Sequence, residues 1–493
     1  MRTAYSVDTV RTAERALMAR LPEGALMQRA AAGLAVVCAE LLGKVYGARV
    51  VLLVGSGDNG GDALYAGARL ARRGAGVSAV LLDSERVHRA GLTALLAAGG
   101  RVAASGERAL AGADLVVDGI VGIGGRGGLR AAALPVVRAA FESRAVVVSV
   151  DLPSGVDADT GQVAGEAVRA DVTVTFGVYK PGLLVDPGRE YAGAVRLVDI
   201  GLELGRDEAD LEALQHGDVA LLLPEPTGES DKYRRGVVGV VAGSARYPGA
   251  AVLAVAGALR GGAGAVRYVG PAAGAVVSRF PETLVSEGAP GKAGRVQAWV
   301  AGPGLGDDAS GLADVLGAEV PLLIDADGLR LADPEAVRGR AAPTLLTPHA
   351  GEAAALLGVA REEVEAERLA AVRELAGRFS ATVLLKGSTT LVAGGREDGA
   401  GRSARVNSTG TAWLATAGSG DVLSGLCGSL LAAGLGALDA GSVGAYLHGL
   451  AARRVSGGAP VVAQDVAGGI AGAWGDVRRG LQGGLQGGLQ GGM

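Results

Sequence analysis

Short apolar runs alternate with helical segments along most of this chain. In the amino-terminal half these runs are rich in Val and Leu and almost continuous, at residues 50–54, 77–82, 115–118, 146–150, 172–176 and 195–198. Strands buried on both faces of a parallel sheet require this composition, because neither face contacts water. The pattern therefore predicts an α/β domain of three layers, with helices on both sides of a sheet, over residues 1–205.

A second series of apolar runs predicts a second α/β domain, over residues 236–478. Its strands are expected to begin at Val237 and to follow at 266–269, 298–301, 322–325, 344–346, 383–385 and 391–393, with three helices between Asp421 and Trp474. The two series share no register, so the domains are not a duplication. Between them, the polar segment 206–235 is predicted to be a linker. The glycine-rich repeat at 479–493 is predicted to be a disordered tail.

Composition and charge restrict the partners. A chain of 493 residues is too long for one hydrophobic core. Its net charge of -4, with both signs interspersed, provides no basic stripe for a nucleic acid. The only cysteines, Cys38 and Cys427, lie far apart, which predicts no disulfide and a cytoplasmic location. The long apolar stretch at 30–42 is interrupted by Glu40, so no membrane span is expected.

The first predicted strand runs into a glycine-rich loop, GSGDNGGDA at residues 55–63. The loop fits G-x-G-x-x-G and precedes a helix, as in dinucleotide-binding domains. However, Asp58 and Asp62 would repel a pyrophosphate unless a cation lay between them, which disfavours an ordinary dehydrogenase. A loop that serves only to turn the chain is the structural alternative, because Asn, Asp and Gly are common turn residues.

Two more acids follow strands of the same domain. Asp118 ends the third strand and precedes the glycine loop 122–128, and Asp151 ends the fourth. The carboxyl ends of parallel strands meet in one crevice, so Asp58, Asp62, Asp118 and Asp151 are expected to share a site that combines a cation with a base. Each acid alone could equally cap a helix or a turn.

These motifs, with VDLPSGVDADTG at 150–161, resemble the YjeF N-terminal family of NAD(P)H-hydrate epimerases over about residues 1–205. The resemblance implies a Rossmann-like fold, Asp151 as the acid/base, and a potassium ion held by Asn59, Asp118 and Ser154. It also implies that the hydrated cofactor contacts two loops, made of Asp58, Asn59, Gly60, Gly61 and Asp62, and of Gly122, Ile123, Gly124, Gly125, Arg126, Gly127 and Gly128.

The sequence departs from that family at three positions. The family more often has Asn at the position of Asp58, Gly at that of Ala63 and Thr at that of Ile123, where a hydroxyl is lost. The expected chemistry is simple, because a hydroxyl on the carbon beside a ring nitrogen is a carbinolamine. Its inversion needs little more than one positioned proton donor and acceptor.

In the second domain the sharpest motif is GSGD at 418–421, which opens a helix. Backbone N–H groups at such a helix start can stabilise a transferring phosphoryl group, and Asp421 can accept a hydroxyl proton. A capped helix start without catalysis is the alternative. Three further loops follow strands, at 302–306, 325–328 and 347–352, and His349 in the last of them is expected to contact a ligand.

These motifs, together with LLKGSTT at 384–390, resemble the ADP/ATP-dependent NAD(P)H-hydrate dehydratases, which have a ribokinase-like fold, over about residues 215–478. The family's usual residues are replaced at Asp231 and Arg330. The resemblance implies that Asp421 deprotonates the hydroxyl of the hydrate. It also implies substrate contacts from Ala250, Gly304 and His349, and adenine-nucleotide contacts from Lys386, Gly387, Ser388, Thr389, Thr390 and Gly420.

The combined expectation is an enzyme of two fused activities that repairs hydrated nicotinamide cofactors, NADHX and NADPHX. It would epimerise the R and S forms and dehydrate the S form at the expense of ADP, in preference to ATP, with Mg²⁺ and K⁺ as cofactors. A homo-oligomer is expected. Two alternatives remain open: a ribokinase-like vitamin or sugar kinase, and a first domain that binds without catalysing.

Overall fold

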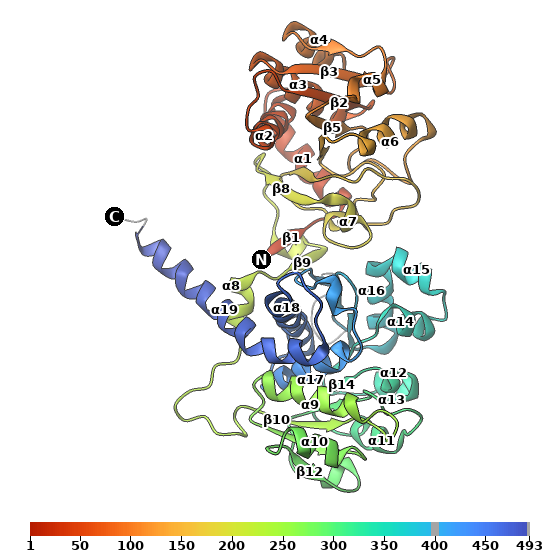
Figure 1. Cartoon of the computed structure of the whole chain (residues 1–493), viewed down its shortest axis with the longest axis vertical. Coiled ribbons are helices and arrows are strands. Elements are labelled where there is room, and N and C mark those ends of the chain that lie inside the picture. Colours follow the sequence, from red (N-terminus) through yellow and green to blue (C-terminus); the bar gives the residue numbers. More distant parts are fainter. Residues whose placement is uncertain (396–403, 491–493) are drawn as a thin grey trace. The chain divides into compact units, whose positions relative to one another are not determined.

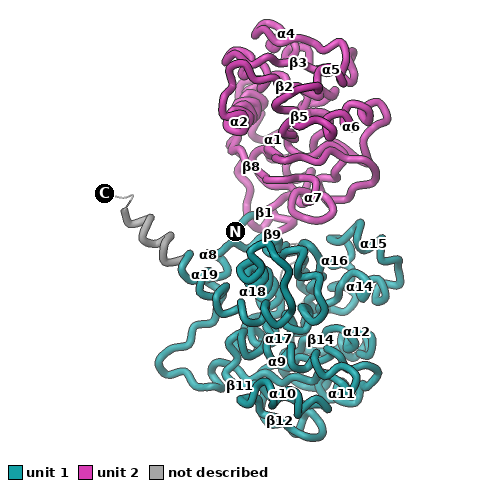
Figure 2. The backbone as a smooth tube through the Cα atoms, in the orientation of Figure 1, with its two compact units in different colours: residues 1–2, 212–493 teal, residues 3–211 magenta. Residues whose placement is uncertain are grey.

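The computed structural model describes residues 1–395 and 404–490, with the side chains of 481–490 left out. The chain forms two compact units, Thr3–Leu211 and Met1–Arg2 with Glu212–Met493 (Figure 2). The boundary lies inside the segment predicted as a linker, which contains β9 (Leu211–Ala213) and α8 (His216–Leu222). Helix α8 was missed because only Val219 and Ala220 are buried in it, too few to produce a periodic pattern.

The smaller unit contains a sheet of seven parallel strands in the order β4-β3-β2-β5-β6-β7-β8. The six predicted strands are confirmed, and only the two-residue β4 was missed. The bounds are β2 Arg49–Val54, β3 Gly76–Leu81, β4 Arg101–Val102, β5 Leu115–Gly119, β6 Val146–Val150, β7 Val172–Phe176 and β8 Ala194–Val198.

Helices cover both faces of this sheet (Figure 1). Alternate residues of β2 point to opposite faces, so Val50 and Leu52 pack with α2 and α3, whereas Val51 and Leu53 pack with α5 and α6. The predicted three-layer arrangement is therefore confirmed. The helices are α1 Val7–Met18, α2 Ala25–Leu42, α3 Asp58–Arg72, α4 Arg89–Ala97, α5 Gly106–Leu110, α6 Leu134–Glu142 and α7 Gly188–Ala192.

Helix α2 is long and apolar enough to cross a membrane by length and composition, although a core helix passes the same test. Its inner face is part of the core, with Leu34 and Cys38 fully buried. Gly33 allows it to lie close to β8, because a Cβ there would come 2.3 Å from the Cγ1 of Val198. Helix α2 therefore packs as a covering layer of the sheet.

The larger unit contains a sheet of eleven strands in the order β1-β9-β18-β17-β16-β15-β14-β13-β10-β11-β12. In the sheet order from β16 to β12, all neighbouring strands are parallel, and β17 is antiparallel to both β16 and β18. The bounds are β1 Arg2–Ala4, β10 Val237–Val241, β11 Ala265–Val269, β12 Leu284–Ser286, β13 Ala298–Ala301, β14 Leu322–Ile324, β15 Thr344–Leu346, β16 Thr382–Leu385, β17 Thr390–Ala393 and β18 Ala404–Asn407.

The largest core cluster joins this sheet to α9 (Pro248–Arg260), α17 (Ser419–Ala432), α18 (Ala437–Ser456) and α19 (Ala463–Gln490). Glycines let α9 and α17 touch backbone to backbone, because a Cβ on Gly425 would come 1.9 Å from the carbonyl oxygen of Ala254. The three predicted carboxyl-terminal helices are present.

Helix α19 extends further than the sequence predicts. It continues to Gln490, into the segment 479–493 for which a disordered tail was predicted, while 491–493 lie outside the described residues. The remaining helices are α10 Ala273–Arg279, α11 Ser310–Leu316, α12 Asp327–Leu331, α13 Pro334–Arg338, α14 Ala350–Leu357, α15 Arg361–Ala366 and α16 Arg368–Phe379.

Candidate active sites

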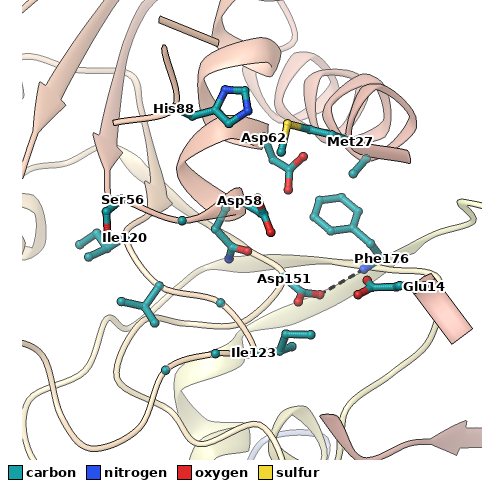
Figure 3. Close-up of a pocket in the computed structure, with 18 of the residues that line it drawn as sticks. Glu14, Met27, Ser56, Asp58, Asp62, His88, Ile120, Ile123, Asp151 and Phe176 are labelled. Atoms are coloured by element: carbon teal, nitrogen blue, oxygen red, sulfur yellow. Dashed lines mark hydrogen bonds between the residues drawn. The ribbon is translucent and has the colours of Figure 1, made fainter. Parts of the chain in front are cut away.

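A cleft of about 1940 Å³ opens in the smaller unit at the carboxyl ends of its strands (Figure 3). It is lined by Asp58, Asn59 and Asp62, by the whole loop 122–128, and by Asp151. Gly60 and Gly61 are buried in α3 behind this lining, where a Cβ on Gly60 would come 2.4 Å from the carbonyl oxygen of Gly55. The structure thus brings together the two predicted substrate loops and the predicted acid/base.

Asp151 is held by a buried ion pair that the sequence did not reveal. Its Oδ1 accepts hydrogen bonds from Lys180 Nζ at 2.5 Å, Thr175 Oγ1 at 3.0 Å and the backbone N–H of Phe176 at 3.4 Å. Lys180 is only 1% exposed and also donates to Thr175 Oγ1. Asp151 has φ 65°, a conformation that L residues rarely adopt and that is often found at functional sites.

Asp118 lies beneath the cleft and is fully buried. Its carboxylate accepts from Ser154 Oγ at 2.6 Å, Ser154 N at 2.9 Å, Ser149 Oγ at 2.8 Å and Ile120 N at 3.3 Å. Burial raises the pKa of Asp118, and these hydrogen bonds oppose the rise. All four donors are neutral, so the hydrogen bonds stabilise the carboxylate without neutralising it.

Asn59 connects this buried carboxylate region to the cleft. Its Nδ2 donates to the carbonyl oxygen of Val150 at 2.5 Å, next to Asp151. Its Oδ1 faces the loop 122–128, where a Cβ on Gly122 would come within 2.2 Å of it. The Asn59 amide therefore occupies the space that a Cβ at position 122 would fill, and any larger residue there would displace the amide.

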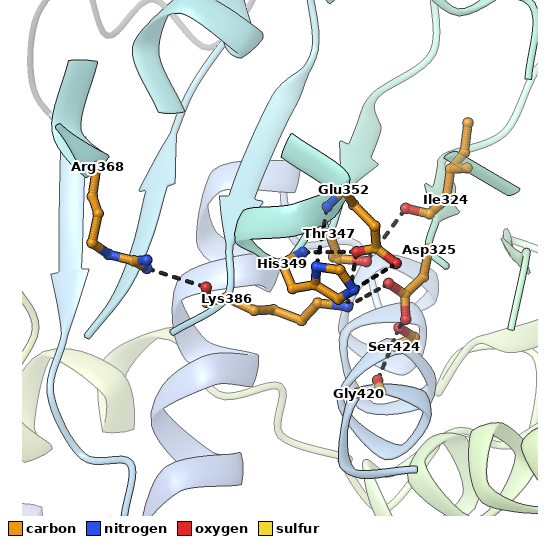
Figure 4. Close-up of polar contacts among 9 residues, drawn as sticks. All are labelled: Ile324, Asp325, Thr347, His349, Glu352, Arg368, Lys386, Gly420 and Ser424. Atoms are coloured by element: carbon orange, nitrogen blue, oxygen red, sulfur yellow. Dashed lines mark hydrogen bonds and ion pairs between the residues drawn. The ribbon is translucent and has the colours of Figure 1, made fainter. Parts of the chain in front are cut away.

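In the larger unit, acids and one lysine meet where several strands end at the amino terminus of α17 (Figure 4). Lys386 Nζ lies 2.7 Å from Asp325 Oδ1 and 3.8 Å from Glu352 Oε2. Asp325 Oδ2 accepts from Ser424 Oγ at 2.6 Å, which ties the carboxylate to α17. A Cβ on Gly420 would lie 3.4 Å from Lys386 Nζ, so the ammonium group is adjacent to the start of α17.

Asp421 follows in the first turn of α17. Burial raises its pKa to about 7, and the negative charges of Asp325, Asp327 and Glu352 contribute while Lys386 opposes them. Burial alone would lower the pKa of Lys386, but Asp325 and Glu352 outweigh it and the pKa is raised. The site therefore contains a stable cation beside a carboxylate that exchanges its proton near neutral pH, as general bases require.

The predicted substrate contacts of this unit lie in the first turn of α9, in the loop after β13 and at the start of α14. A Cβ on Gly304, which has φ 66°, would come 2.6 Å from the Cβ of Ala250, so these two residues are neighbours. His349 caps α14. Its ring Nδ1 accepts from the backbone N–H of Glu352 at 3.1 Å, and the backbone N–H of His349 donates to Glu352 Oε2 at 2.7 Å. The imidazole nevertheless remains exposed, with 60% of its side-chain surface accessible.

Arg368, at the start of α16, forms hydrogen bonds to the backbone of the predicted nucleotide loop after Lys386. The Arg368 guanidinium is buried and donates to the carbonyl oxygens of Lys386 at 3.1 Å and Thr389 at 3.0 Å. A Cβ on Gly387 would come 2.2 Å from Arg368 Nη2, so a larger residue there would displace the guanidinium. Thr389 is fully buried, whereas Ser388 is exposed and Thr390 partly so, which divides this loop into supporting and accessible positions.

The comparisons with known proteins match both units. The family model described as YjeF-related protein N-terminus matches residues 23–182, and the model described as NAD(P)H-hydrate dehydratase matches 238–466. The bifunctional NAD(P)H-hydrate repair enzyme of Mycobacterium leprae is 50% identical over 462 residues, 92% of this chain and 94% of the relative. The chain belongs to this family of bifunctional repair enzymes.

More distant relatives carry the same name. The bifunctional NAD(P)H-hydrate repair enzyme of Escherichia coli is 34% identical over 421 residues, 82% of this chain and 80% of the relative. Among solved structures, the ADP/ATP-dependent NAD(P)H-hydrate dehydratase of Bacillus subtilis, co-crystallised with ATP and Mg²⁺, is 28% identical. It covers 53% of this chain and 97% of its own, with a TM-score of 0.49.

Two departures from the repair-enzyme pattern have local explanations. Asp231 accepts from the N–H groups of Tyr233 at 2.7 Å and Arg234 at 2.9 Å, so it forms a turn, and these bonds lower its pKa. Arg330 donates to the carbonyl oxygen of Gly306 at 2.9 Å and to Asp307 Oδ1 at 2.8 Å. Both residues therefore shape exposed loops of the dehydratase unit.

His448 of the repair enzyme was missed because it lies within an apolar helix, α18. It is 6% exposed, and its Nε2 has no hydrogen-bond partner in the described chain. Burial lowers its pKa to about 4, against an opposing hydrogen bond with the backbone of Ser419 at the start of α17. The imidazole is therefore neutral in the folded state and packs behind the site.

This burial predicts acid sensitivity of the dehydratase unit. Between pH 6.5 and about 4 the unfolded chain binds a proton at His448 that the folded chain rejects, so stability falls as pH falls. A shift of this size corresponds to about 3 kcal/mol. Unfolding by urea, followed by fluorescence, reports on this unit alone, because Trp299, Trp413 and Trp474 all lie in it. In His448→Gln the fall of stability with pH should be shallower. An equal fall in wild type and variant would show that His448 does not cause the acid sensitivity.

Proposed function

We propose that this chain repairs NADHX and NADPHX in two steps, one in each unit. The smaller unit interconverts the R and S epimers, and the larger unit dehydrates the S epimer with ADP as phosphoryl donor, giving AMP and phosphate. The observation that carries the proposal is the pairing of Asp421, whose pKa is raised to about 7, with Lys386 at the amino terminus of α17. This arrangement suits transfer of a phosphoryl group to a hydroxyl.

In the epimerase unit, Asp151 exchanges the proton of the hydroxyl at the carbinolamine carbon. Lys180 and Thr175 both donate to its Oδ1, so they fix the orientation of the carboxylate that lines the cleft. The ring nitrogen takes part, because the carbon–nitrogen bond of a carbinolamine can open to an aldehyde and close again on either face of that carbon. The segment 55–63, which contains the start of α3, and the loop 122–128 hold the rest of the cofactor in the cleft, where backbone N–H groups can bind phosphate oxygens.

In the dehydratase unit, Asp421 accepts the proton of the substrate hydroxyl while its oxygen attacks the terminal phosphorus of the nucleotide. Lys386 and the first N–H groups of α17 stabilise the negative charge that develops on the phosphoryl oxygens. The phosphorylated hydroxyl then leaves as phosphate, with help from the ring nitrogen, and loss of a proton from the neighbouring ring carbon restores the dihydropyridine. Hydroxide is a poor leaving group and phosphate is a good one, which explains the need for a nucleotide.

Mg²⁺ is expected to accompany the nucleotide. In the part of the chain that the structure describes, no group of three or more His, Cys, Asp or Glu side chains is placed to hold a metal ion. Mg²⁺ usually keeps several waters and binds through substrate phosphates with one or two carboxylates. The residues present fit that mode, with Asp327 and Glu352 as the nearby acids. When bound, the ion would neutralise phosphate charge.

The oxygen atoms around Asp118 fit a potassium ion. Ser154 Oγ donates to Asp118, and it also accepts from the N–H of Val121, next to Gly122, which the amide oxygen of Asn59 faces. The Asp118 carboxylate is fully buried and receives only neutral hydrogen-bond donors, so a monovalent cation would offset its charge. Oxygen donors of this kind suit K⁺.

Replacing K⁺ by Li⁺ is therefore expected to lower both the melting temperature of the epimerase unit and its activity. A ligand at one hundred times its Kd stabilises a fold by about 2.7 kcal/mol. Calorimetry in K⁺ or Li⁺ at equal ionic strength measures the shift. The tryptophan-monitored transition of the dehydratase unit is the internal control. Equal stabilities of the epimerase unit in both salts would contradict the potassium site.

The proposed function is tested with both NADHX epimers, K⁺ and Mg²⁺, and with ADP or ATP, following recovery of dihydronicotinamide absorbance. Complete recovery with ADP is expected. Recovery that stops when the S epimer is exhausted would refute the epimerase, and no recovery with either nucleotide would refute the dehydratase. A phosphoester product from a stable alcohol would indicate a vitamin or sugar kinase instead.

Location and assembly complete the proposal: a cytoplasmic homo-oligomer. Both cysteines are free and buried, and burial raises the pKa of both thiols, which keeps them unreactive in a reducing compartment. On α2, Val36 and Leu41 are exposed apolar residues that a second copy could cover. Sedimentation of the full chain measures the mass, and a monomer at all concentrations would contradict an oligomer.

A further inference from the structure

Asp62 is a buried acid that the mechanism above leaves unused. It lies in α3, is 6% exposed, and its Oδ1 has no hydrogen-bond partner among the described residues. It lines the cleft, where its carboxyl group faces the same space as Asp58 and Asp151, with Met27 and Phe176 beside it (Figure 3). An unpartnered carboxyl group in such a place destabilises the fold and calls for a functional reason.

A helix-capping role does not explain Asp62. The N-cap of α3 is Gly57, five residues earlier, and Asp62 is already in the helix body. Its apolar neighbours remove water, so burial raises its pKa well above the usual range, and the charges of Asp151, Asp58 and Glu14 raise it further. Asp62 thus retains its proton at a pH where an exposed Asp has lost it.

Among the ionisable groups around the cleft, the carboxylates make a proton on Asp62 more favourable, and the cations that line the cleft are Arg11, Arg15, Arg126 and Arg130. Glu14 of α1 also has a raised pKa, chiefly from burial. Lys180, which is buried, is already paired with Asp151. His88, at the start of α4, uses its Nδ1 to accept the N–H of Gly91 at 3.0 Å. Two carboxyl groups in one cleft thus have opposite surroundings, one paired with a cation and one without a partner.

We propose that Asp62 is a second catalytic residue of the epimerase, the proton donor to the ring nitrogen, while Asp151 accepts the proton of the hydroxyl. The proposal rests on the epimerisation proposed above and adds a separate acid to it. One base alone would have to serve both the oxygen and the nitrogen of the carbinolamine. Two carboxyl groups on the walls of one cleft can serve each atom separately.

The proton transfers balance in both directions. Asp151 removes the hydroxyl proton, the carbon–nitrogen bond breaks to give an aldehyde, and its electron pair on nitrogen takes the proton of Asp62. The aldehyde then rotates about the neighbouring carbon–carbon single bond and presents its other face. Nitrogen attacks the carbonyl carbon, its proton returns to Asp62, and Asp151 returns a proton to oxygen. The product is the opposite epimer, with no oxidant or other reactant consumed.

The test is the pH dependence of epimerisation in Asp62→Asn, with full-length protein and one pure epimer. Asn has nearly the same shape but cannot give up a proton reversibly, so turnover is expected to fall by about 10²-fold or more. The wild-type rate should decline at high pH as Asp62 loses its proton, and the variant should lack this decline. KM should change little. Asp114→Asn is the matched control and should behave as wild type. Asp114 directly precedes β5, at the end of that strand that lies away from the cleft.

Two further measurements keep the outcomes distinct. Asp62→Glu retains an acid and should keep the high-pH decline with part of the turnover, even if Asp62→Asn fails to fold. Dehydration of the pure S epimer should be unchanged in both variants. Turnover of Asp62→Asn within threefold of wild type, or a rise in KM alone, would overturn the role of Asp62 as an acid. Absence of epimerisation in the wild type would instead refute the proposed function.

Discussion

Asp421→Asn is expected to reduce the turnover of dehydration by about 10³-fold, within the range of general-base catalysis. The amide has the size of the carboxylate but cannot accept the hydroxyl proton during phosphoryl transfer. Lys386, Asp325 and Ser424 are untouched by the change, so the nucleotide should still bind. Initial rates with the pure S epimer and saturating ADP measure the effect, and the KM for ADP is expected to stay within about twofold.

The pH dependence identifies the base more sharply than the loss of rate. Because the pKa of Asp421 is raised to about 7, half of the wild-type enzyme carries a protonated, inactive Asp421 at that pH. Dehydration should therefore accelerate as pH rises through about 7 and level off above it. The residual rate of Asp421→Asn should show no such rise.

Controls separate this effect from damage to the fold. Asp314→Asn changes an exposed carboxylate on α11 of the same unit and should leave dehydration unaltered. Epimerisation by the same Asp421→Asn sample should match the wild type. If Asp421→Asn dehydrates at a rate within threefold of wild type, Asp421 is not the base.

Asp151→Asn is expected to reduce the turnover of epimerisation by about 10²-fold to 10⁴-fold, while dehydration continues. The amide oxygen can still accept from Lys180 and Thr175, so the orientation of the side chain is kept while its basicity is lost. With a mixture of both epimers, recovery of dihydronicotinamide absorbance should stop when the S epimer is consumed. Complete recovery at the normal rate would show that Asp151 is dispensable.

The ion pair with Lys180 allows a check on the cause. Lys180→Met leaves the Asp151 charge buried without a partner, and breaking such a pair destabilises a fold by about 3–5 kcal/mol. The double variant, Asp151→Asn with Lys180→Met, removes both charges and should regain part of that stability. If the double variant is less stable than either single variant, the two side chains do not act as a pair. Calorimetry of the epimerase unit measures all three.

Much of the fold was predictable because buried parallel strands need continuous apolar runs. The runs at 50–54 and 146–150 became β2 and β6, and the acids that follow such runs met at one edge of each sheet. Short elements escaped prediction, as β12 shows with three residues and little apolar content. The two α/β sheets, and the strand ends at which the candidate acids lie, could thus be predicted from the sequence.

The partners of the site residues could not be predicted in the same way. Lys180 lies 29 residues from Asp151, and Ser424 lies 99 residues from Asp325, with no periodic signal linking them. Glu14, Arg368 and His448 are ordinary helix residues in the sequence, where a charged or polar residue usually faces water. Their roles arise only because the fold places them beside the sites, where Arg368 and His448 are buried and Glu14 is partly buried.

The sequence by itself determined the type and order of the elements, because strand and helix patterns are local properties of the chain. It also placed the candidate acids at strand ends. Only the tertiary structure decided how these acids differ: Asp151 is paired with a buried lysine, the Oδ1 of Asp62 has no hydrogen-bond partner among the described residues, and Asp421 has a pKa raised to about 7. The reason is that a carboxyl group's proton affinity depends on the water it loses and the charges it gains, and both come from residues distant in the chain.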